Sequence, residues 1–219
     1  MNPLDSPAFA ALSSAILSDV MDSLGVDRNA MKPFVRPLVD GCRMLGRART
    51  GVYVPVAGLR AGENPYAVEI ALVDDLKPGD VVVLACNGPT DRIAPWGELL
   101  STAASVRGAT GCVTDGLVRD VRQIREMGFP VFHGGIGPLD TKGRARMVES
   151  DVAVECAGVV VNPGDLVFGD VDGVVVVPRE REAEVLARAA VKLAGENDTR
   201  AALLAGESLV SVFARIGIL

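Results

Sequence analysis

Apolar residues recur at two different spacings along this chain, and the two spacings separate its predicted helices from its predicted strands. A return of apolar positions every three or four residues predicts an amphipathic helix, and a short aliphatic run between turn residues predicts a buried strand. The two patterns alternate, which is typical of an α/β protein with a mainly parallel sheet. The helical pattern covers Phe9 to Leu24, Asn64 to Asp75, Trp96 to Val106 and Val121 to Met127, and the strand pattern covers Arg47 to Val56, Val81 to Cys86, Gly111 to Thr114 and Val131 to His133.

Turn and capping residues mark the borders of these elements. Ser6-Pro7 favours the beginning of the first helix, because serine caps helices and proline fits their first turn, and Gly25 favours its end. We expect a loop from Val26 to Asp40. Gly134 to Val148 contains several glycines and charges, which predicts an irregular loop at the rim of the sheet.

The C-terminal part of the chain has a different pattern. Three short strands, Gly158 to Asp165, Leu166 to Asp170 and Gly173 to Pro178, predict a β-meander packed beside the α/β part. A charged amphipathic helix follows over Arg179 to Ala194, with one or two further helices between Asn197 and Leu219. No low-complexity linker interrupts the 219 residues, so we expect a single domain with a helical tail over about 179–219.

Composition and charge narrow the possible partners. Hydrophobic residues make up 49% of the chain and aromatic residues 4%, so the core has to be aliphatic, as in packed α/β layers. The net charge of -6 argues against nucleic acid as a partner, because phosphate backbones need clustered lysine and arginine. The short basic segment from Arg43 to Arg49 lacks an aromatic residue for base stacking.

The cysteines and the N-terminal residues indicate a cytoplasmic protein. Cys42, Cys86, Cys112 and Cys156 lie far apart and form no Cys-x-x-Cys pair, which predicts free thiols and disfavours a thiolate zinc site. The N-terminus has no basic region followed by an apolar core, so we expect no secretory signal. No uncharged run is long enough to cross a bilayer, so we expect no membrane partner.

His133 is the only histidine of the chain, and this limits the metal chemistry. A site with several histidine ligands is excluded, and a mechanism based on a histidine triad is weakened. We interpret His133 as a structural or rim residue at the end of a strand. Metal ligands should then be oxygen atoms, which suit Mg²⁺ or Mn²⁺.

The first candidate site element is Arg119-Asp120. The strand that begins at Gly111 is expected to stop at Asp115-Gly116, and the following helix leaves Arg119 and Asp120 side by side at the turn. Open α/β sheets bind ligands at the carboxyl ends of their strands. A guanidinium suits a carboxylate, and a carboxylate suits a hard cation, so the pair predicts a site for an anionic oxo-acid and its metal. The alternative is a surface ion pair at a helix start.

The second candidate element begins at Trp96-Gly97-Glu98. The first turn of a helix presents unpaired N–H groups and a partial positive charge, where a substrate carboxylate can dock. Gly97 lets the backbone approach closely, and Glu98 can face a metal directly or through water. The alternative is an ordinary helix start, with Glu98 favourable for the helix dipole and Leu99 and Leu100 in the core.

Four stretches of the chain carry a resemblance to a known family, and they are Trp96 to Ala104, Thr114 to Asp120, Gly128 to Phe132, and Asn162 to Asp165 with Asp172 to Pro178. In order and spacing they resemble the 4-hydroxy-4-methyl-2-oxoglutarate aldolase family, which includes the regulator of ribonuclease activity A proteins. The resemblance covers about Ser18 to Glu184. It implies an α/β/α fold assembled as homotrimers or pairs of trimers. It also implies a class II, metal-dependent pyruvate aldolase with oxaloacetate decarboxylation as a side activity.

The resemblance implies roles for single residues around the metal. Arg119 matches the arginine that grips the pyruvyl group and stabilises its enolate. Asp120 matches the carboxylate that binds Mg²⁺ or Mn²⁺ directly, and Glu98 matches an acidic residue that holds a metal-bound water. A metal-bound water of this kind would protonate the enolate carbon.

Further roles concern the substrate and a neighbouring subunit. Gly97, Leu99 and Leu100 match the loop whose backbone amides receive the substrate carboxylate. In the family a neighbouring subunit supplies a glutamate, for which Glu196 is the candidate. No lysine lies within the two motifs, which disfavours a Schiff-base mechanism, and we interpret Lys142 as an anion-steering residue.

Two other functions compete with the lyase. Some relatives are regulators that bind and inhibit a ribonuclease without catalysis, and Glu98 together with Arg119-Asp120 favours the enzyme. Relatives have also been named methyltransferases, but no glycine-rich cofactor loop of the usual form follows the first strand. The substrate, a 2-oxo acid with methyl or carboxymethyl at its tertiary carbon, stays open because loops such as Gly134 to Val148 decide it.

Overall fold

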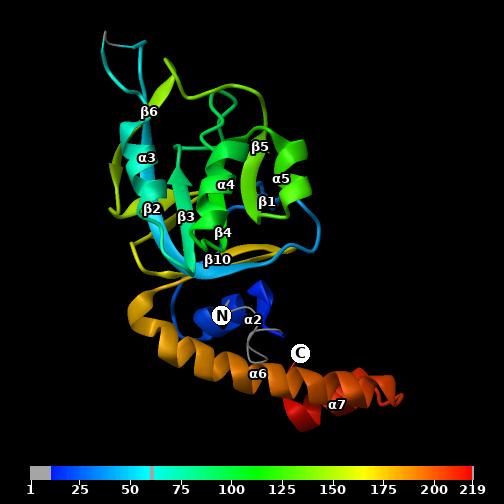
Figure 1. Ribbon diagram of the computed structural model, residues 1–219. Coiled ribbons are helices and arrows are strands. Elements are labelled where there is room, and N and C mark those ends of the chain that lie inside the picture. The colour runs from blue at the N-terminus through cyan, green and yellow to red at the C-terminus, as the bar shows by residue number, and fades with distance from the viewer. Residues whose placement is uncertain (1–10, 60–61, 219) are drawn as a thin grey trace.

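The computed structural model describes residues 11–59 and 62–218. From β2 to β5 strands and helices alternate along the chain, and after β5 strands follow one another up to the C-terminal helices (Figure 1). The helices are α2 (Ser14–Ser23), α3 (Ala67–Asp74), α4 (Glu98–Val106), α5 (Val121–Met127), the short 3-10 helix η2 (Arg179–Arg181), α6 (Glu182–Leu204) and α7 (Leu209–Ile216). The strands are β1 (Arg36–Pro37), β2 (Met44–Pro55), β3 (Asp80–Ala85), β4 (Gly111–Val118), β5 (Val131–Ile136), β6 (Ala145–Ser150), β7 (Val154–Cys156), β8 (Val159–Val161), β9 (Leu166–Asp170) and β10 (Gly173–Val177).

One sheet of mixed direction organises the fold. Its strand order is β1-β5-β4-β3-β2-β9-β10, with β6 also paired to β2. The strands from β2 to β5 run parallel, and β6, β9 and β10 pair in the antiparallel direction. The segment before β1 nearly closes the sheet onto β10, because Ala30 bridges Val175 and the Met31 amide donates to the carbonyl of Val174 at 2.9 Å.

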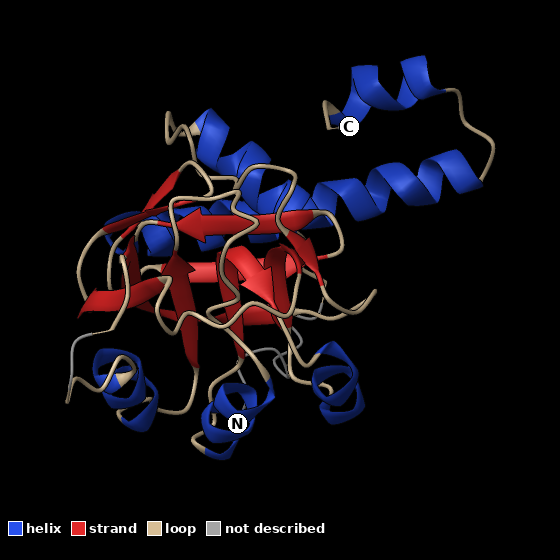
Figure 2. Ribbon diagram, turned by 90° about the horizontal axis from the view of Figure 1, so that it is seen from above, coloured by secondary structure: helices blue, strands red, loops and turns tan. Residues whose placement is uncertain are grey.

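Three apolar clusters hold the layers together. Valines at alternate positions of β3 face opposite sides, so that Val81 and Val83 lie inside the curled sheet and Val82 lies under the helices α3, α4 and α5. A third cluster packs α2 and α6 against the outer face of β9 and β10. Figure 2 shows the strands between these two groups of helices. The predicted α/β class, with helical layers and a C-terminal helix, is therefore confirmed.

The expected β-meander is built differently from the prediction. Its strands exist, but β9 pairs with β2, so the β9–β10 hairpin extends the main sheet. The strands β7 and β8 form a separate hairpin, and their side chains fill the inside of the curled sheet. The pairing of β9 with β2 joins segments more than a hundred residues apart, which local patterning does not show.

The strand β4 continues past the expected stop at Asp115-Gly116. A register shift between Thr114 and Leu117 absorbs the irregular residues, as a β-bulge does. The buried Asp115 side chain accepts hydrogen bonds from the amides of Cys86 at 2.6 Å and Gly88 at 2.8 Å. Asp115 therefore ties β4 to the loop after β3, and the turn itself falls at Arg119 and Asp120.

Other element ends also differ from the prediction. The first helix begins at Ser14, where Ser13 caps it, and the expected beginning at Ser6-Pro7 lies outside the described residues. The predicted loops contain the short strand β1, the end of β5 and the first part of β6. The predicted helix from Arg179 to Ala194 continues as α6 to Leu204.

The C-terminal helices form a hairpin. A Cβ atom at Gly195 would collide with Ile218, so the glycine permits the close return of the chain, and the Thr199 hydroxyl donates to the carbonyl of Ile218 at 3.1 Å. The long helix α6 extends well beyond the sheet (Figure 1). None of the helices in the described part of the chain is long and apolar enough to span a membrane.

Candidate active site

The predicted site residues meet where β4 ends and α4 begins. Trp96 forms a parallel bridge with Val118, and the Arg119 amide donates to the carbonyl of Trp96 at 3.0 Å. This pairing carries Gly97 next to the turn after β4. The two sequence elements that were predicted separately are thus brought together at the carboxyl ends of neighbouring strands.

Asp120 occupies a backbone conformation that is unusual for a residue with a side chain. Its φ of 56° and ψ of 35° lie in the left-handed region, at the N-cap of α5. Its side chain makes no capping hydrogen bond to α5, and Oδ2 instead accepts from the Glu98 amide at 3.3 Å. The carboxylate therefore points toward the start of α4. Such conformations persist where the surrounding structure holds them, and they cluster at ligand sites.

Only a glycine fits at position 97, because the backbone there passes close to the side chains of Arg119 and Asp120. A Cβ atom at this position would lie 2.7 Å from Asp120 Oδ2 and 3.1 Å from Arg119 Cγ. Gly97 has no side chain to cap α4, and Asp120 takes only the Glu98 amide, so the amides of Leu99 and Leu100 keep their capacity to bind an anion. The sequence predicted that Gly97 lets the backbone approach closely, and these contacts give the steric reason.

A cavity of about 330 Å³ opens at this junction. Arg119, Asp120, Gly97, Leu99 and Leu100 all line it. Its remaining walls come from α3, from the loop before α4 and from the loop between β5 and β6. These further lining residues are Tyr66, Glu69, Ile70, Ala94, Pro95, Trp96, Asp140 and Thr141.

The Arg119 guanidinium is held loosely between two carboxylates. Its Nε lies 3.9 Å from Asp120 Oδ2, and its Nη2 lies 3.6 Å from Asp140 Oδ1. These distances exceed those of good charge-assisted hydrogen bonds. The Nε atom is buried and has no hydrogen-bond partner among the described residues. A buried donor without a partner is costly, so Arg119 has donors available for an anionic ligand in the cavity.

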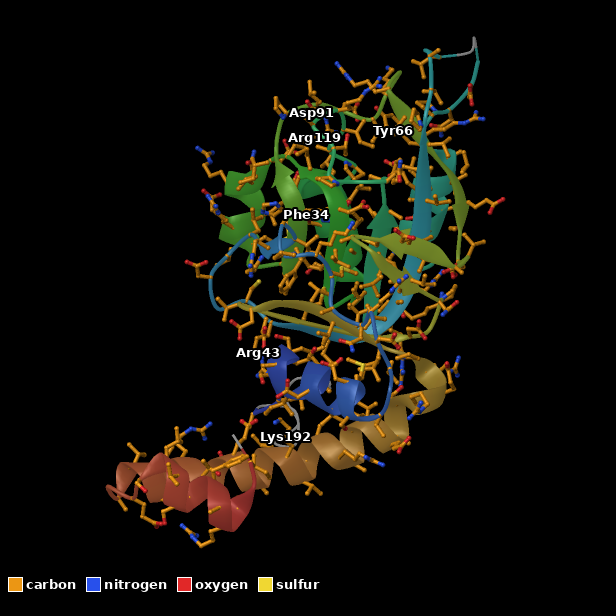
Figure 3. The ribbon with its side chains drawn as sticks, turned by 180° about the vertical axis from the view of Figure 1, so that it is seen from behind. Phe34, Arg43, Tyr66, Asp91, Arg119 and Lys192 are labelled. Atoms are coloured by element: carbon orange, nitrogen blue, oxygen red, sulfur yellow. The ribbon has the colours of Figure 1, made fainter. Side chains whose placement is uncertain are left out.

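Two hydrogen-bonded tyrosine–carboxylate pairs lie near Arg119. The Tyr66 hydroxyl donates to Asp140 Oδ2 at 2.5 Å, and the Tyr53 hydroxyl donates to Glu69 Oε2 at 2.5 Å. Burial, followed by the hydrogen bond to Asp140, raises the pKa of Tyr66 to about 12. Tyr66 and Arg119 lie at the same end of the molecule (Figure 3).

The carboxyl groups of the two pairs have opposite pKa shifts. Burial opposes ionisation of Asp140, but the hydrogen bond from Tyr66 and the charge of Arg119 lower its pKa below the ordinary value. Burial raises the pKa of Glu69 to about 7, against the smaller lowering effect of the Tyr53 hydrogen bond. Of these two carboxyl groups, Asp140 therefore stays ionised near neutral pH, whereas Glu69 can exchange its proton.

Sequence reasoning missed these four residues. The chain has only two tyrosines, and Glu69 is the single acid inside the apolar run from Ala67 to Val73. Both features were available signals, because a lone acid on an apolar helix needs a partner when it is buried.

The other residues considered in the sequence lie away from this cavity. Glu98 is at the start of α4, where its carboxylate accepts from the Thr102 hydroxyl at 2.8 Å, and its side chain does not line the cavity. His133 is buried, and burial followed by the charge of Arg125 lowers its pKa. Lys142 is exposed beyond the rim.

Glu196 lies on α6, at the other end of the molecule from Arg119. Its carboxylate is 3.6 Å from Lys192 Nζ, and Figure 3 shows Lys192 opposite to Arg119. A glutamate from this helix therefore cannot reach the cavity of its own chain.

The side chains at the junction determine how many protein ligands a cation would have there. No group of three or more histidine, cysteine or acidic side chains with metal-binding geometry occurs in residues 11–59 and 62–218. Asp120 nevertheless points a carboxylate into the junction. Mg²⁺ typically binds proteins through one or two carboxylates and completes its shell with water and substrate oxygens, so the donor set fits a hard cation of this kind.

Comparison with known proteins gives a consistent family. The family model RraA-like, described as Aldolase/RraA, matches residues 14–176. A Halalkalibacterium halodurans protein, provisionally named 4-hydroxy-4-methyl-2-oxoglutarate aldolase, is 34% identical over 188 residues, which cover 86% of this chain and 83% of the relative. Protein DlpA of Legionella pneumophila is 31% identical over 90% of this chain, but this chain spans only 31% of that relative.

A solved structure has the same fold. Streptomyces coelicolor RraAS2, described as an unusual member of the RNase ES inhibitor RraA protein family, superimposes with a TM-score of 0.80 at 29% identity. The match covers 88% of this chain and 94% of that one.

Replacement of Gly97 by alanine tests the steric argument. In Gly97→Ala the new Cβ has to displace Asp120 or Arg119, so we expect binding of oxalate, a small dianion, to weaken by about tenfold, or about 1.4 kcal/mol. Titration calorimetry in the presence of Mg²⁺ measures the affinity, and thermal unfolding controls for the fold. Unchanged oxalate affinity in the folded variant would contradict the assignment of this corner as the anion site.

Proposed function

This chain belongs to the RraA-like family, and from that premise we propose that it is a divalent-metal-dependent pyruvate aldolase. This carbon–carbon lyase would cleave 4-hydroxy-4-methyl-2-oxoglutarate, or a related 4-hydroxy-2-oxo diacid, to pyruvate and a second oxo acid. Oxaloacetate decarboxylation would be its side activity. The observation that carries the proposal is the partnerless Nε of Arg119 beside Asp120 in one cavity.

In this proposal the protein binds the pyruvyl end of the substrate from two sides. Amides of the first turn of α4, at Leu99 and Leu100, receive the carboxylate, and Gly97 makes room for it. The Arg119 guanidinium faces the 2-oxo oxygen and stabilises the negative charge that develops there when the neighbouring carbon–carbon bond breaks. Support comes from the start of α4, where Gly97 provides no side-chain cap, and from the partnerless Nε of Arg119.

A bound Mg²⁺ or Mn²⁺ would supply Lewis-acid polarisation of the same oxygen. We propose that Asp120 holds this cation directly and that Glu98 acts on it through water. Asp120 presents a carboxylate that makes no cap to its own helix, and Glu98 is adjacent through its amide. Lys142 is exposed on the rim and does not line the cavity, so no lysine is available there for a Schiff base.

The alternative function is a regulator that binds a ribonuclease without catalysis. The description of Streptomyces coelicolor RraAS2 as a member of an RNase inhibitor family favours it. A regulator needs a binding surface but no paired cation and anion sites inside a cavity. The joint placement of Arg119, Asp120 and Gly97 therefore favours the lyase.

We further propose that the chain is one domain that assembles as a homotrimer or a pair of trimers. Closed rings satisfy a head-to-tail interface without leaving a free end. The helical tail carries exposed apolar side chains at Leu204, Val210 and Phe213, which a neighbouring subunit can cover. Glu196 would then reach the cavity of a neighbour, since it cannot reach its own.

Metal dependence is a direct prediction of the proposed function. The proposed ligands are oxygen atoms, so EDTA should abolish pyruvate release, and Mg²⁺ or Mn²⁺ should restore it. In Asp120→Ala the heat of Mn²⁺ binding in titration calorimetry should disappear. Full activity of the metal-free protein contradicts the proposed cofactor.

Replacement of Arg119 tests its part in charge stabilisation. Arg119→Lys keeps one positive charge but loses the planar fork, so we expect kcat to fall by about 10²–10³-fold, as after loss of one preorganised donor. Stability should change little, because the side chain is 38% exposed. Arg122→Lys on the exposed face of α5 is the matched control. Turnover near the normal value in Arg119→Lys refutes the assigned role.

The shared site can be tested by mixing subunits. Glu196→Gln and Arg119→Lys should each reduce activity, and co-refolded mixtures should regain part of it, because some sites in a mixed ring receive both normal residues. Light scattering measures assembly, and pyruvate release measures recovery. If mixtures show no recovery, or if a monomer is fully active, the proposed contribution of Glu196 is wrong.

A further inference from the structure

Glu69 is a titratable group of the cavity to which the proposed roles assign no part in the reaction. It lies on α3 as a buried residue, 8% exposed, and still lines the cavity together with Arg119. Its Oε2 accepts from the Tyr53 hydroxyl at 2.5 Å. Oε1 accepts no hydrogen bond from the described residues, and it keeps some exposure to solvent. One carboxylate oxygen is thus anchored, and the other is open to a ligand.

The surroundings of Glu69 suit a group that exchanges a proton. Tyr53 of β2 and Arg119 after β4 stabilise its ionised form, whereas burial and Asp140 oppose it, and the pKa lies at about 7. Tyr66, one turn earlier on α3, is the other titratable side chain near it. An acid–base residue works best when its pKa lies near the operating pH.

We propose that Glu69 is the proton-transfer residue of this site, taking the proton of the substrate 4-hydroxyl and returning it to C3 of the pyruvyl fragment. This inference rests on the proposed function, because it assigns a residue to the same cavity. The two oxygens of Glu69 divide the work: Tyr53 fixes Oε2, and Oε1 carries the proton.

The chemical step balances without a further reactant. The Glu69 carboxylate removes the 4-hydroxyl proton, the C4–O bond becomes a carbonyl, and the C3–C4 bond breaks. The electron pair of that bond forms the enolate of pyruvate, whose oxygen faces Arg119. The protonated Glu69 then gives the same proton to C3, which yields the methyl group of pyruvate and restores the carboxylate.

Oxaloacetate decarboxylation provides an internal control. Carbon dioxide leaves when the C3–C4 bond breaks, and the electron pair forms the same enolate, so no hydroxyl proton has to be removed. Water can supply the proton that C3 then needs. Loss of Glu69 should therefore affect aldol cleavage far more than decarboxylation, whereas loss of Arg119 should affect both.

The test compares Glu69→Gln with wild type in both reactions. Glutamine keeps an oxygen that accepts from Tyr53 but cannot carry the proton. We expect kcat of cleavage to fall by about 10²–10⁴-fold, the usual contribution of general acid–base catalysis, and decarboxylation to change by less than about tenfold. Asp74→Asn, at the exposed end of the same helix, should change neither reaction. Circular dichroism and denaturant unfolding check that each variant is folded.

The pH profile separates proton transfer from a structural role. Wild-type kcat/KM for cleavage should lose activity on the acidic side with a midpoint near pH 7. In Tyr53→Phe this midpoint should move to higher pH, because the lost hydrogen bond had lowered the pKa of Glu69. A folded Glu69→Gln protein that keeps normal cleavage, or that loses both reactions equally, overturns the role of Glu69 alone. A wild-type protein with neither reaction overturns the proposed function as well.

Discussion

The contact between the start of α4 and the turn after β4 determines the rest of the site. Trp96 and Val118 form a bridge there, and only a glycine at position 97 allows the backbone to pass so close to Arg119 and Asp120. The approach also directs the Asp120 carboxylate toward α4 and away from its own helix. The Asp120 carboxylate, the start of α4 and the Arg119 guanidinium consequently lie at one cavity, an arrangement that preorganised electrostatic stabilisation requires.

The balance of charge in the cavity follows from this contact. Arg119 is its single lining cation, and Glu69, Asp120 and Asp140 are its lining carboxylates. Without a bound cation, the three carboxyl groups carry more negative charge than the one guanidinium can balance. Excess charge of this kind is unfavourable where the groups are partly removed from water. Two of the acids are relieved by tyrosine hydroxyls, which donate to Asp140 and to Glu69. Asp120 has the Glu98 amide and, at 3.9 Å, the Arg119 Nε, but no tyrosine hydroxyl, which is consistent with its proposed assignment to a divalent cation.

The sequence predicted those parts of the site that depend on short segments. Arg119, Asp120 and Gly97 follow neighbouring parallel strands, and the carboxyl ends of such strands share one edge, so their proximity could be expected. Glu69 and Asp140 reach the cavity from α3 and from the loop after β5, and their approach depends on how the sheet curls. Short segments also could not show that the predicted β-meander joins the main sheet, because the pairing of β9 with β2 is a long-range contact. The end of β4 differs from the prediction where the Asp115 side chain binds backbone amides of the loop after β3.

The near closure of the sheet also separates the two ends of the molecule. With β10 bridged to the segment around Ala30, the helices α2 and α6 are confined to the face beneath β9 and β10, away from Arg119. A single subunit therefore cannot use its own α6 to complete the cavity. The apolar side chains exposed on α7 would remain in water in a monomer, at a cost that burial against a second copy removes. In the proposed assembly, the subunit that covers α7 would also lie beside α6, the other helix of the same hairpin and the one that carries Glu196.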